Sequence, residues 1–322
     1  MHETRANWTD LIAGVGLQIA EVFDQGQEEY APSASEVFQV TGGAGAQKNI
    51  AGKTGSGRLK KFDDGDDIPT GRRFKTYSTQ VNYNNYGEAV MVTANAIDDR
   101  DWSAELDEMK DLSVAANFSM DEAAFQLLNG SFATTTLVNG YEMTWYGDAV
   151  PLFSTVHPTV VPGGTTQSNA SSTGVKLTHD NIEIGKVALI EQKTDDGLPL
   201  AMLGNSTLVT CPQLEKEAIE ITQSVLQPQN ANHALNVYKG NTNLVTSLFL
   251  GAANSGSDTR WFMTIVGRNK LVQEVRQAPA LNSDTNILNK VITFTVDARW
   301  ANYSKDWRRN WASKGDLATY SA

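Results

Sequence analysis

Cysteine is nearly absent from this sequence: Cys211 is the one cysteine among 322 residues. A single thiol excludes an internal disulfide framework and is typical of a protein that folds in a reducing compartment. Because Cys211 lies in the apolar segment STLVTCP, we expect a buried structural thiol rather than a nucleophile. The sequence also lacks an apolar run long enough to cross a bilayer, so no membrane partner is expected.

Positive charge is in short supply as well. The chain has 26 Lys and Arg residues against 37 Asp and Glu residues, which gives a net charge of -11. An acidic chain binds DNA and anionic membranes poorly, so any nucleic-acid contact should be weak or local. The length and the hydrophobic content of 40% allow a large core, in one elaborate domain or two modest ones.

One segment, NIAGKTGSGRLKKFDDGDD at 49–67, has the letters of a phosphate-binding loop without its spacing. Such a loop needs a glycine five residues before its Gly-Lys pair, and Gln47 occupies that position. The glycines that follow GKT also oppose the start of a helix there. The DDGDD turn lacks the spacing of a calcium loop, so we expect no metal and no cofactor.

Two further motifs have weak catalytic or binding patterns. Ser154 and His157 in LFSTVHP resemble a nucleophile and base, but no orienting acid or oxyanion motif accompanies them, which favours a structural turn. His179 and His233 lack metal-ligand spacing. The segment 299–311, RWANYSKDWRRNW, interleaves basic and aromatic residues. This composition suits nucleic acid or a protein interface, and the acidic balance favours the interface.

The first third of the chain predicts an arm, a hairpin and a long helix. Apolar residues at helical spacing in 8–23 predict an amphipathic helix that docks on a partner or on the body. The charged segment 49–75 leads into two strand-like segments, which predicts a long hairpin with a charged outer part. Apolar residues recur every three or four positions over 102–128 and predict a helix of roughly 42 Å.

The remaining sequence predicts an α/β unit followed by strands. THDNIEIGKVALIEQ predicts a helix, with Asp180 and Glu183 spaced as an acidic capping box. STLVTCP predicts a strand, and Pro212 then opens another helix. Near the C-terminus, NKVITFTVDARW alternates between apolar and polar residues, which predicts a strand with one buried face.

Several stretches taken together resemble one family. DGDDIPTGRRFKTYSTQVNYNNYGEAVMVTANAIDD, the helix ending AAFQLLNGSF, VPLFSTVHP and YSKDWRRNWASKGD occur in the same order as in the major capsid proteins of tailed bacteriophages. The chain is most similar to the Mu-like major head subunit group, over about 7–316. This resemblance implies the α+β capsid fold of the Hong Kong ninety-seven type.

The resemblance divides the chain into the parts of that fold. It implies an N-terminal arm at 1–48, an extended β-hairpin loop at 49–92, a peripheral domain with a long spine helix at 93–149, a mostly axial domain at 150–255, and return strands of the peripheral domain at 256–322.

The implied function is structural rather than enzymatic. The subunit would assemble with itself into pentamers and hexamers of an icosahedral shell around double-stranded DNA, without sequence-specific binding. A separate scaffolding protein, a maturation protease, a portal and a decoration protein are implied as further partners. The protein would belong to the virion and assemble in the bacterial cytoplasm. The alternatives are an encapsulin-like compartment and an α/β hydrolase using Ser154 and His157.

The charged hairpin is the main candidate site, because opposite charges along it can pair with a neighbouring subunit and fix the register. Exposed pairs contribute only about 0–1 kcal/mol each, so the gain is specificity and reversibility. The candidate contact residues of the extended loop are Arg58, Lys60, Lys61, Asp63, Asp64, Asp66, Asp67, Arg72 and Arg73. Those of the N-terminal arm and the C-terminus are Trp8, Phe23, Trp307, Arg308, Arg309 and Trp311.

Overall fold

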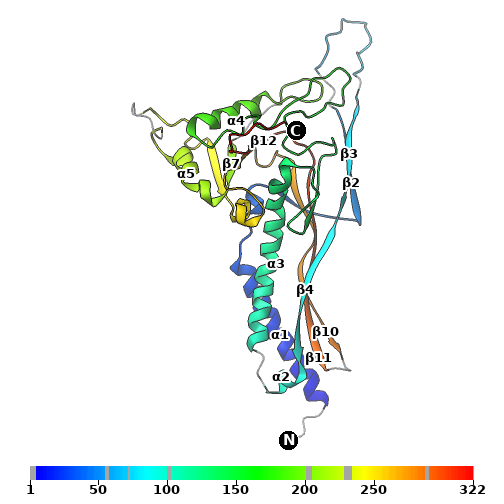
Figure 1. The fold of residues 1–322 in the computed structure, drawn as a ribbon. Coiled ribbons are helices and arrows are strands. Elements are labelled where there is room, and N and C mark those ends of the chain that lie inside the picture. The colour runs from blue at the N-terminus through cyan, green and yellow to red at the C-terminus, as the bar shows by residue number, and fades with distance from the viewer. Residues whose placement is uncertain are drawn as a thin grey trace.

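The computed structural model describes residues 5–54, 58–71, 73–99, 103–200, 205–227, 234–286 and 290–321. It has three parts: a long shaft, a triangular body at one end of the shaft, and a hairpin that runs past the body (Figure 1). The N-terminus lies at the free end of the shaft, and the C-terminus lies in the body.

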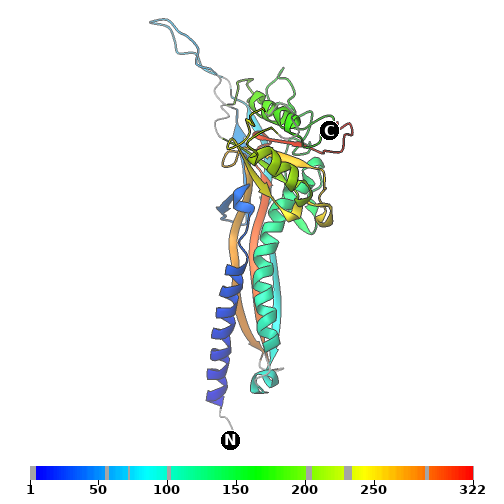
Figure 2. The same ribbon diagram turned by 90° about the vertical axis from the view of Figure 1, so that its left-hand side faces the viewer.

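The shaft combines two long helices with a six-stranded sheet. Both views show α1 and α3 running side by side along one face of this sheet (Figures 1 and 2). The helices are α1 (Arg5–Glu29), α2 (Ala94–Asp99) and α3 (Ser103–Asn129). The strands are β1 (Gln39–Gly42), β10 (Leu271–Asn286), β11 (Val291–Ser304), β6 (Tyr141–Thr144) and β5 (Leu137–Val138), with β4 (Asn84–Thr93) also paired to β11.

The body is built on a four-stranded sheet in the order β12-β9-β7-β8. β7 is parallel to β8 and antiparallel to β9, so the sheet is mixed. Its strands are β7 (Ser206–Thr210), β8 (Thr242–Thr246), β9 (Trp261–Thr264) and β12 (Asn310–Ser313). Its helices are α4 (His179–Glu191) and α5 (Glu215–Gln223). Short 3-10 turns cover 34–36, 130–132, 212–214, 248–250 and 252–254.

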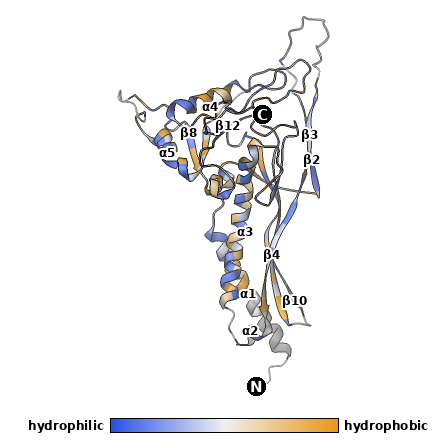
Figure 3. Ribbon diagram, viewed as in Figure 1, coloured by the Kyte–Doolittle hydropathy of each residue, from blue (hydrophilic) through white to orange (hydrophobic). Residues whose placement is uncertain are grey.

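The hairpin consists of β2 (Gln47–Lys53) and β3 (Lys75–Asn82), which pair antiparallel. Its ribbon is largely in the hydrophilic colours of Figure 3. The chain between the two strands projects beyond the body (Figure 1).

The apolar cores follow from the periodicities in the sequence. Along β11, every second residue from Ile292 to Trp300 is buried, as a strand with one covered face requires. Ile19 and Phe23 of α1 join Met109 of α3 in the core of the shaft. A larger aromatic cluster fills the junction of shaft and body, with Phe125, Phe132, Phe153, Phe249, Phe262 and Trp307 among its members.

Several predictions from sequence are confirmed. The long helix expected at 102–128 is α3, and the N-terminal helix docks on α3 of its own chain. Gln27 Nε2 donates to the Ser113 carbonyl of α3 at 2.9 Å, and Asn117 Nδ2 of α3 donates to the Gln27 carbonyl at 3.1 Å. The N-terminal helix, α1, extends beyond the expected 8–23 and ends at Glu29.

Other details are corrected. The long hairpin expected over 49–92 ends at Asn82, because β4 leaves it to pair with β11 in the shaft. The last segment, 256–322, divides between the two sheets: β9 and β12 join β7 in the body, while β10 and β11 form the shaft. The N-cap of α4 is Thr178, whose side chain accepts from the Asn181 N–H, so the expected capping box at Asp180 is wrong.

None of the helices that the structure describes combines the length and apolar character required to cross a lipid bilayer.

Candidate functional site

The projecting loop between β2 and β3 presents its side chains to solvent. Every described residue from 58 to 71 is exposed, including three large apolar side chains: Leu59, Phe62 and Ile68 are 102%, 51% and 74% exposed. Single exposed apolar residues are ordinary, but three in one short loop leave an unusual amount of apolar surface exposed to solvent.

The charged residues predicted for this loop are exposed wherever the structure describes them. Arg58, Lys60, Lys61, Asp63, Asp64, Asp66, Asp67 and Arg73 are all exposed, and Arg72 lies outside the described residues. Lys61 Nζ and Asp63 Oδ1 are 3.3 Å apart. At the base of the loop, the Thr54 N–H donates to the Phe74 carbonyl at 2.8 Å, and the Phe74 N–H donates to Thr54 Oγ1 at 2.9 Å. The loop therefore has a closed base and a free tip.

The predicted contact residues near the two termini lie mostly in the subunit's own interior. Phe23, Trp307 and Trp311 are buried in the core clusters of the chain. Arg308 is also buried, and its guanidinium forms ion pairs with Asp195 and Asp306 at 2.8 and 3.0 Å, which compensate its charge. These four side chains serve the fold of the subunit rather than its surface. The alternating basic and aromatic residues of 299–311 belong to the end of β11, a turn and β12.

The other two members of that set differ. Arg309 is partly buried, and its N–H donates to Gln192 Oε1 at 2.6 Å. The side chain of Trp8 lies outside what the structure describes.

The hairpin is anchored to the shaft by a buried carboxylate. Lys48 Nζ of β2 binds both oxygens of Glu274 on β10, at 2.6 and 2.7 Å, and the Tyr303 hydroxyl of β11 donates to the same carboxylate. Burial opposes ionisation of Glu274, but hydrogen bonds from Lys48, Tyr303 and Tyr83 outweigh it and hold its pKa below the ordinary value. Burial and the bond to Glu274 raise the pKa of Tyr303.

A second buried carboxylate fixes the segment after α1. Asp121 of α3 accepts from the Tyr30 hydroxyl at 2.7 Å, the Ser33 N–H at 3.1 Å, the Ser33 hydroxyl at 3.0 Å and the Ala34 N–H at 2.6 Å. Burial, and then the bond to Asp121, raise the pKa of Tyr30. The chain leaving α1 is therefore fastened to the middle of α3.

His157 has a carboxylate partner, as the histidine of a catalytic triad does, but its second ring nitrogen contacts an asparagine rather than a serine. His157 Nδ1 is 2.7 Å from Asp148 Oδ2, and its Nε2 is 3.0 Å from Asn169 Oδ1. The ring is buried and stacks on Trp307 with centroids 4.2 Å apart. Both ring nitrogens therefore have fixed partners, and neither is left to accept a proton from Ser154.

Asp148 is the partner that sequence reasoning missed. It lies nine residues before His157 and is buried, and nothing in its neighbours, YGDAVP, distinguishes it from a surface turn. The expectation that Ser154 and His157 form a structural turn nonetheless agrees with the burial of both residues. Cys211 is buried too, and burial raises the pKa of its thiol, which suits the structural role predicted for it.

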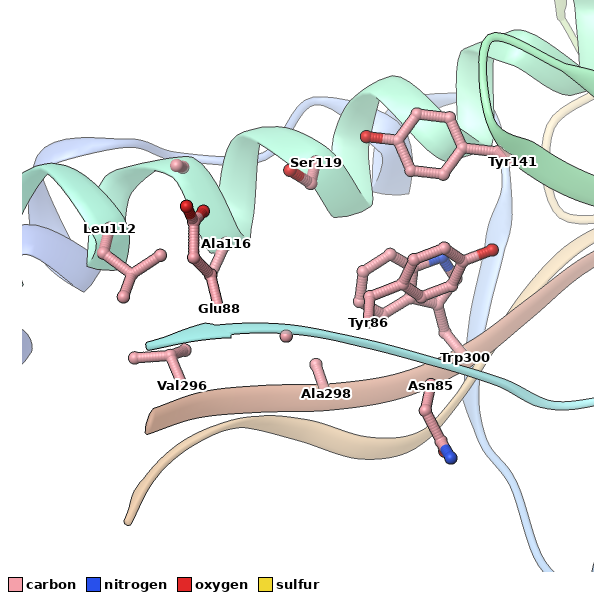
Figure 4. A pocket seen from close by; sticks show the side chains of 12 residues that line it. Asn85, Tyr86, Glu88, Leu112, Ala116, Ser119, Tyr141, Val296, Ala298 and Trp300 are labelled. Carbon is pink, nitrogen blue, oxygen red and sulfur yellow. The ribbon is translucent and has the colours of Figure 1, made fainter. Parts of the chain in front are cut away.

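A hollow of about 390 Å³ opens between α3, β4 and β11 (Figure 4). Leu112, Ala116 and Ser119 line it from α3, and Tyr86 of β4 stacks on Trp300 of β11 with centroids 4.2 Å apart. Glu88 is the single carboxylate among its described lining residues.

No group of three or more histidine, cysteine or carboxylate side chains in the described part of the chain is arranged to hold a metal ion. His179 Nδ1 instead lies 3.0 Å from Gln227 Nε2. His233 lies outside the described residues.

Comparison with solved structures identifies the fold. The capsid of bacteriophage JBD30 matches with a TM-score of 0.54 and 17% identity, over 69% of this chain and 92% of that chain. The capsid of Ralstonia phage GP4 matches with a TM-score of 0.53 and 14% identity, over 87% of each chain. The capsid of the native GTA particle matches with a TM-score of 0.52 and 12% identity, over 91% of this chain and 92% of that chain.

The chain has the tailed-phage capsid fold. The predicted α+β fold of the Hong Kong ninety-seven type is therefore confirmed. No family model matches the sequence, and no curated protein matches it either. Within this fold, α3 is the long helix of the shaft, and the β2–β3 hairpin carries the projecting loop.

Proposed function

We propose that this protein is the major capsid subunit of a tailed bacteriophage and that it assembles with itself into pentamers and hexamers of an icosahedral shell around double-stranded DNA. The capsid fold carries this proposal, since the solved capsids that match it cover up to 91% of the chain. That coverage is most of the chain, which supports a whole-chain role in a shell.

The projecting loop is the part of the subunit that we assign to contacts between subunits. Its charged and apolar side chains are exposed together, so they are available for contacts with a neighbouring subunit. Exposed charge pairs contribute about 0–1 kcal/mol each, which keeps single contacts reversible while many copies hold the shell. The net charge of -11 suits a container that must not bind its genome tightly.

The remaining assignments complete this role. Residues 1–48 form the N-terminal arm, the β2–β3 hairpin up to Asn82 carries the extended loop, and 93–149 belong to the peripheral domain with the spine helix. Residues 150–255 form most of the axial domain. A separate scaffolding protein, a maturation protease, a portal and a decoration protein are the proposed partners, and the virion assembled in the bacterial cytoplasm is the proposed location. We propose no enzymatic activity and no cofactor.

An encapsulin-like compartment is the second candidate on the same fold. The matched phage capsids favour the genome container. The contents of purified shells separate the two: double-stranded DNA supports the phage capsid, whereas a packaged enzyme supports the compartment.

Charge reversal in the loop tests the assignment. Lys60→Glu with Lys61→Glu should leave the subunit folded and impair shell formation, because both side chains are exposed and distant from the core. Lys176→Glu with Lys216→Glu is the matched control, since it changes the net charge equally at exposed positions outside the loop. Melting temperature measures folding, and electron microscopy measures assembly. Normal shells from the loop variant would show that these charges are only a solvated face.

A further inference from the structure

A second hollow, of about 330 Å³, lies at the base of the projecting loop. Residues 50–54 of β2 and its end, together with Thr76 and Tyr77 of β3, form one side. The other side comes from the body and the end of the shaft, including Thr194 and Tyr146. We call it the lysine hollow, because Lys53, Lys270 and Lys305 line it together with Arg308, Asp195 and Asp306.

The charges of the lysine hollow do not balance. Both of its carboxylates, Asp195 and Asp306, are bound to Arg308. Lys53, Lys270 and Lys305 have no ion pair with any residue that the structure describes. Burial, and then the nearby charges of Lys48 and Lys270, lower the pKa of Lys305, although the Glu274 carboxylate opposes the shift. An anion seated here would relieve that crowding, in a chain that is otherwise strongly acidic.

The tip of the projecting loop carries a matching group of carboxylates. Asp63, Asp64, Asp66 and Asp67 are all exposed. The Asp66 N–H donates to the Asp63 carbonyl at 3.1 Å, and Gly65 between them has a φ of 93°, so the chain reverses sharply at the tip. Lys61 lies 3.3 Å from Asp63, whereas Asp64, Asp66 and Asp67 have no ion pair with any residue that the structure describes. The turn 63–67 therefore presents a local excess of negative charge on a small, protruding feature.

The turn 63–67 does not reach the lysine hollow of its own chain. In both ribbon views the loop extends away from the body (Figures 1 and 2). The residues that line the hollow come instead from the ends of β2 and β3 next to the loop and from the body. Tip and hollow are thus two different surfaces of opposite charge on one subunit. A contact between different surfaces of identical subunits is heterologous, and it generates rings when the rotation closes.

We propose that the acidic turn 63–67 of one copy docks in the lysine hollow of a second copy, and that this contact repeats head to tail around a ring of subunits. The inference rests on the proposed function, since it requires the chain to assemble with itself. It names the receptor for the loop tip, with Lys270 and Lys305 as the principal partners of the carboxylates. Nucleic-acid phosphate is the competing occupant, and the test below separates the two.

Zero-length crosslinking tests the contact in assembled shells. Shells are assembled from an equal mixture of ¹⁴N- and ¹⁵N-labelled chains and treated with a water-soluble carbodiimide. The reagent activates an aspartate carboxylate, the lysine amine displaces the activated group as a urea, and an amide bond forms only where the two side chains touch. Mass spectrometry should find peptides containing 63–67 joined to Lys270 or Lys305, in isotopically mixed as well as unmixed pairs.

Each other outcome contradicts the inference in a distinguishable way. Shells without these crosslinks would overturn the docking contact and leave the proposed function standing. Joined peptides that are always isotopically unmixed would show a contact within one chain. Chains that remain monomeric under every condition would overturn the proposed function, and the docking contact with it. DNA that protects Lys270 and Lys305 from acetylation in shells that lack the crosslinks would assign the hollow to phosphate.

A charge-swap series provides an independent readout. Lys270→Glu with Lys305→Glu should reduce shell yield at least tenfold, and so should Asp64→Lys with Asp66→Lys. All four substitutions in one chain should restore assembly, because the contact then has its charges exchanged. Lys176→Glu with Lys216→Glu is the matched control and should assemble normally. Failure of the four-fold variant to recover, with each variant folded by circular dichroism, would overturn the pairing.

Discussion

The attachment of the N-terminal segment to α3 should depend on the single carboxylate of Asp121. Asp121 is fully buried and accepts four hydrogen bonds, from Tyr30, Ser33 and Ala34. The change Asp121→Ala removes the acceptor for all of them at once. Two of the four donors are backbone N–H groups that need a partner when they are covered.

The expected cost follows from these contacts. A hydrogen bond to a charged group contributes roughly 1.5–3 kcal/mol. Only the Ala34 N–H bond is fully buried, and the other donors are partly exposed and can bind water instead. Alanine also gains about 0.5 kcal/mol of helix propensity over aspartate. We therefore expect Asp121→Ala to cost about 3 kcal/mol, well below the simple sum.

Hydrogen exchange measures this cost locally. Protection of the amides in 16–38 should fall roughly 100-fold, since each 1.4 kcal/mol is a factor of ten. Glu122→Ala is the matched control: it also removes a helix carboxylate, but Glu122 is partly exposed and accepts from Asn139 in an exposed bond and from Tyr141 at 3.2 Å. It should cost less than about 1 kcal/mol. Unchanged exchange over 16–38 in Asp121→Ala would refute the anchoring role.

Three further predictions follow from the same structure. Because the pKa of Glu274 lies below its ordinary 4.5, its contribution to stability is complete above that pH and is lost on acidification through the lowered value. The protection factors of the amides in β2 and β3 should therefore fall only in acid, and protection factors that stay constant would contradict the anchor. His157→Ala should destabilise the subunit by about 2–4 kcal/mol in urea unfolding, since it breaks a buried pair; unchanged stability with loss of a hydrolytic activity would instead support catalysis. Gly185→Ala should cost about 1–3 kcal/mol, because its Cβ would meet Met263 Sδ at 2.5 Å and Trp311 at 3.0 Å; a variant as stable as the parent would show that α4 can shift.

Local periodicity made much of the fold predictable. The helix α3 and the buried face of β11 are visible in the sequence, because the spacing of apolar residues depends only on neighbours along the chain. Long-range pairing is different. β4 leaves the hairpin because its partner, β11, lies about two hundred residues away in sequence, and neither strand's composition records that pairing.

The candidate site shows the same division. The exposure of the loop charges was predictable, since a segment so rich in charge cannot bury itself. The burial of Trp307 and Trp311 was not, because basic and aromatic letters look alike on a surface and in a strand packed against a core. The pairing of Asp148 with His157 and the gathering of Lys53, Lys270 and Lys305 depend on the folded chain alone.

Electron microscopy of the purified protein, alone and with its candidate scaffolding protein, decides whether this chain builds a shell. We expect closed icosahedral shells, or rings of five and six subunits, together with their loss in the Lys60→Glu and Lys61→Glu variant. Uniform monomers or small dimers under both conditions, from a chain that is folded by circular dichroism, would contradict it.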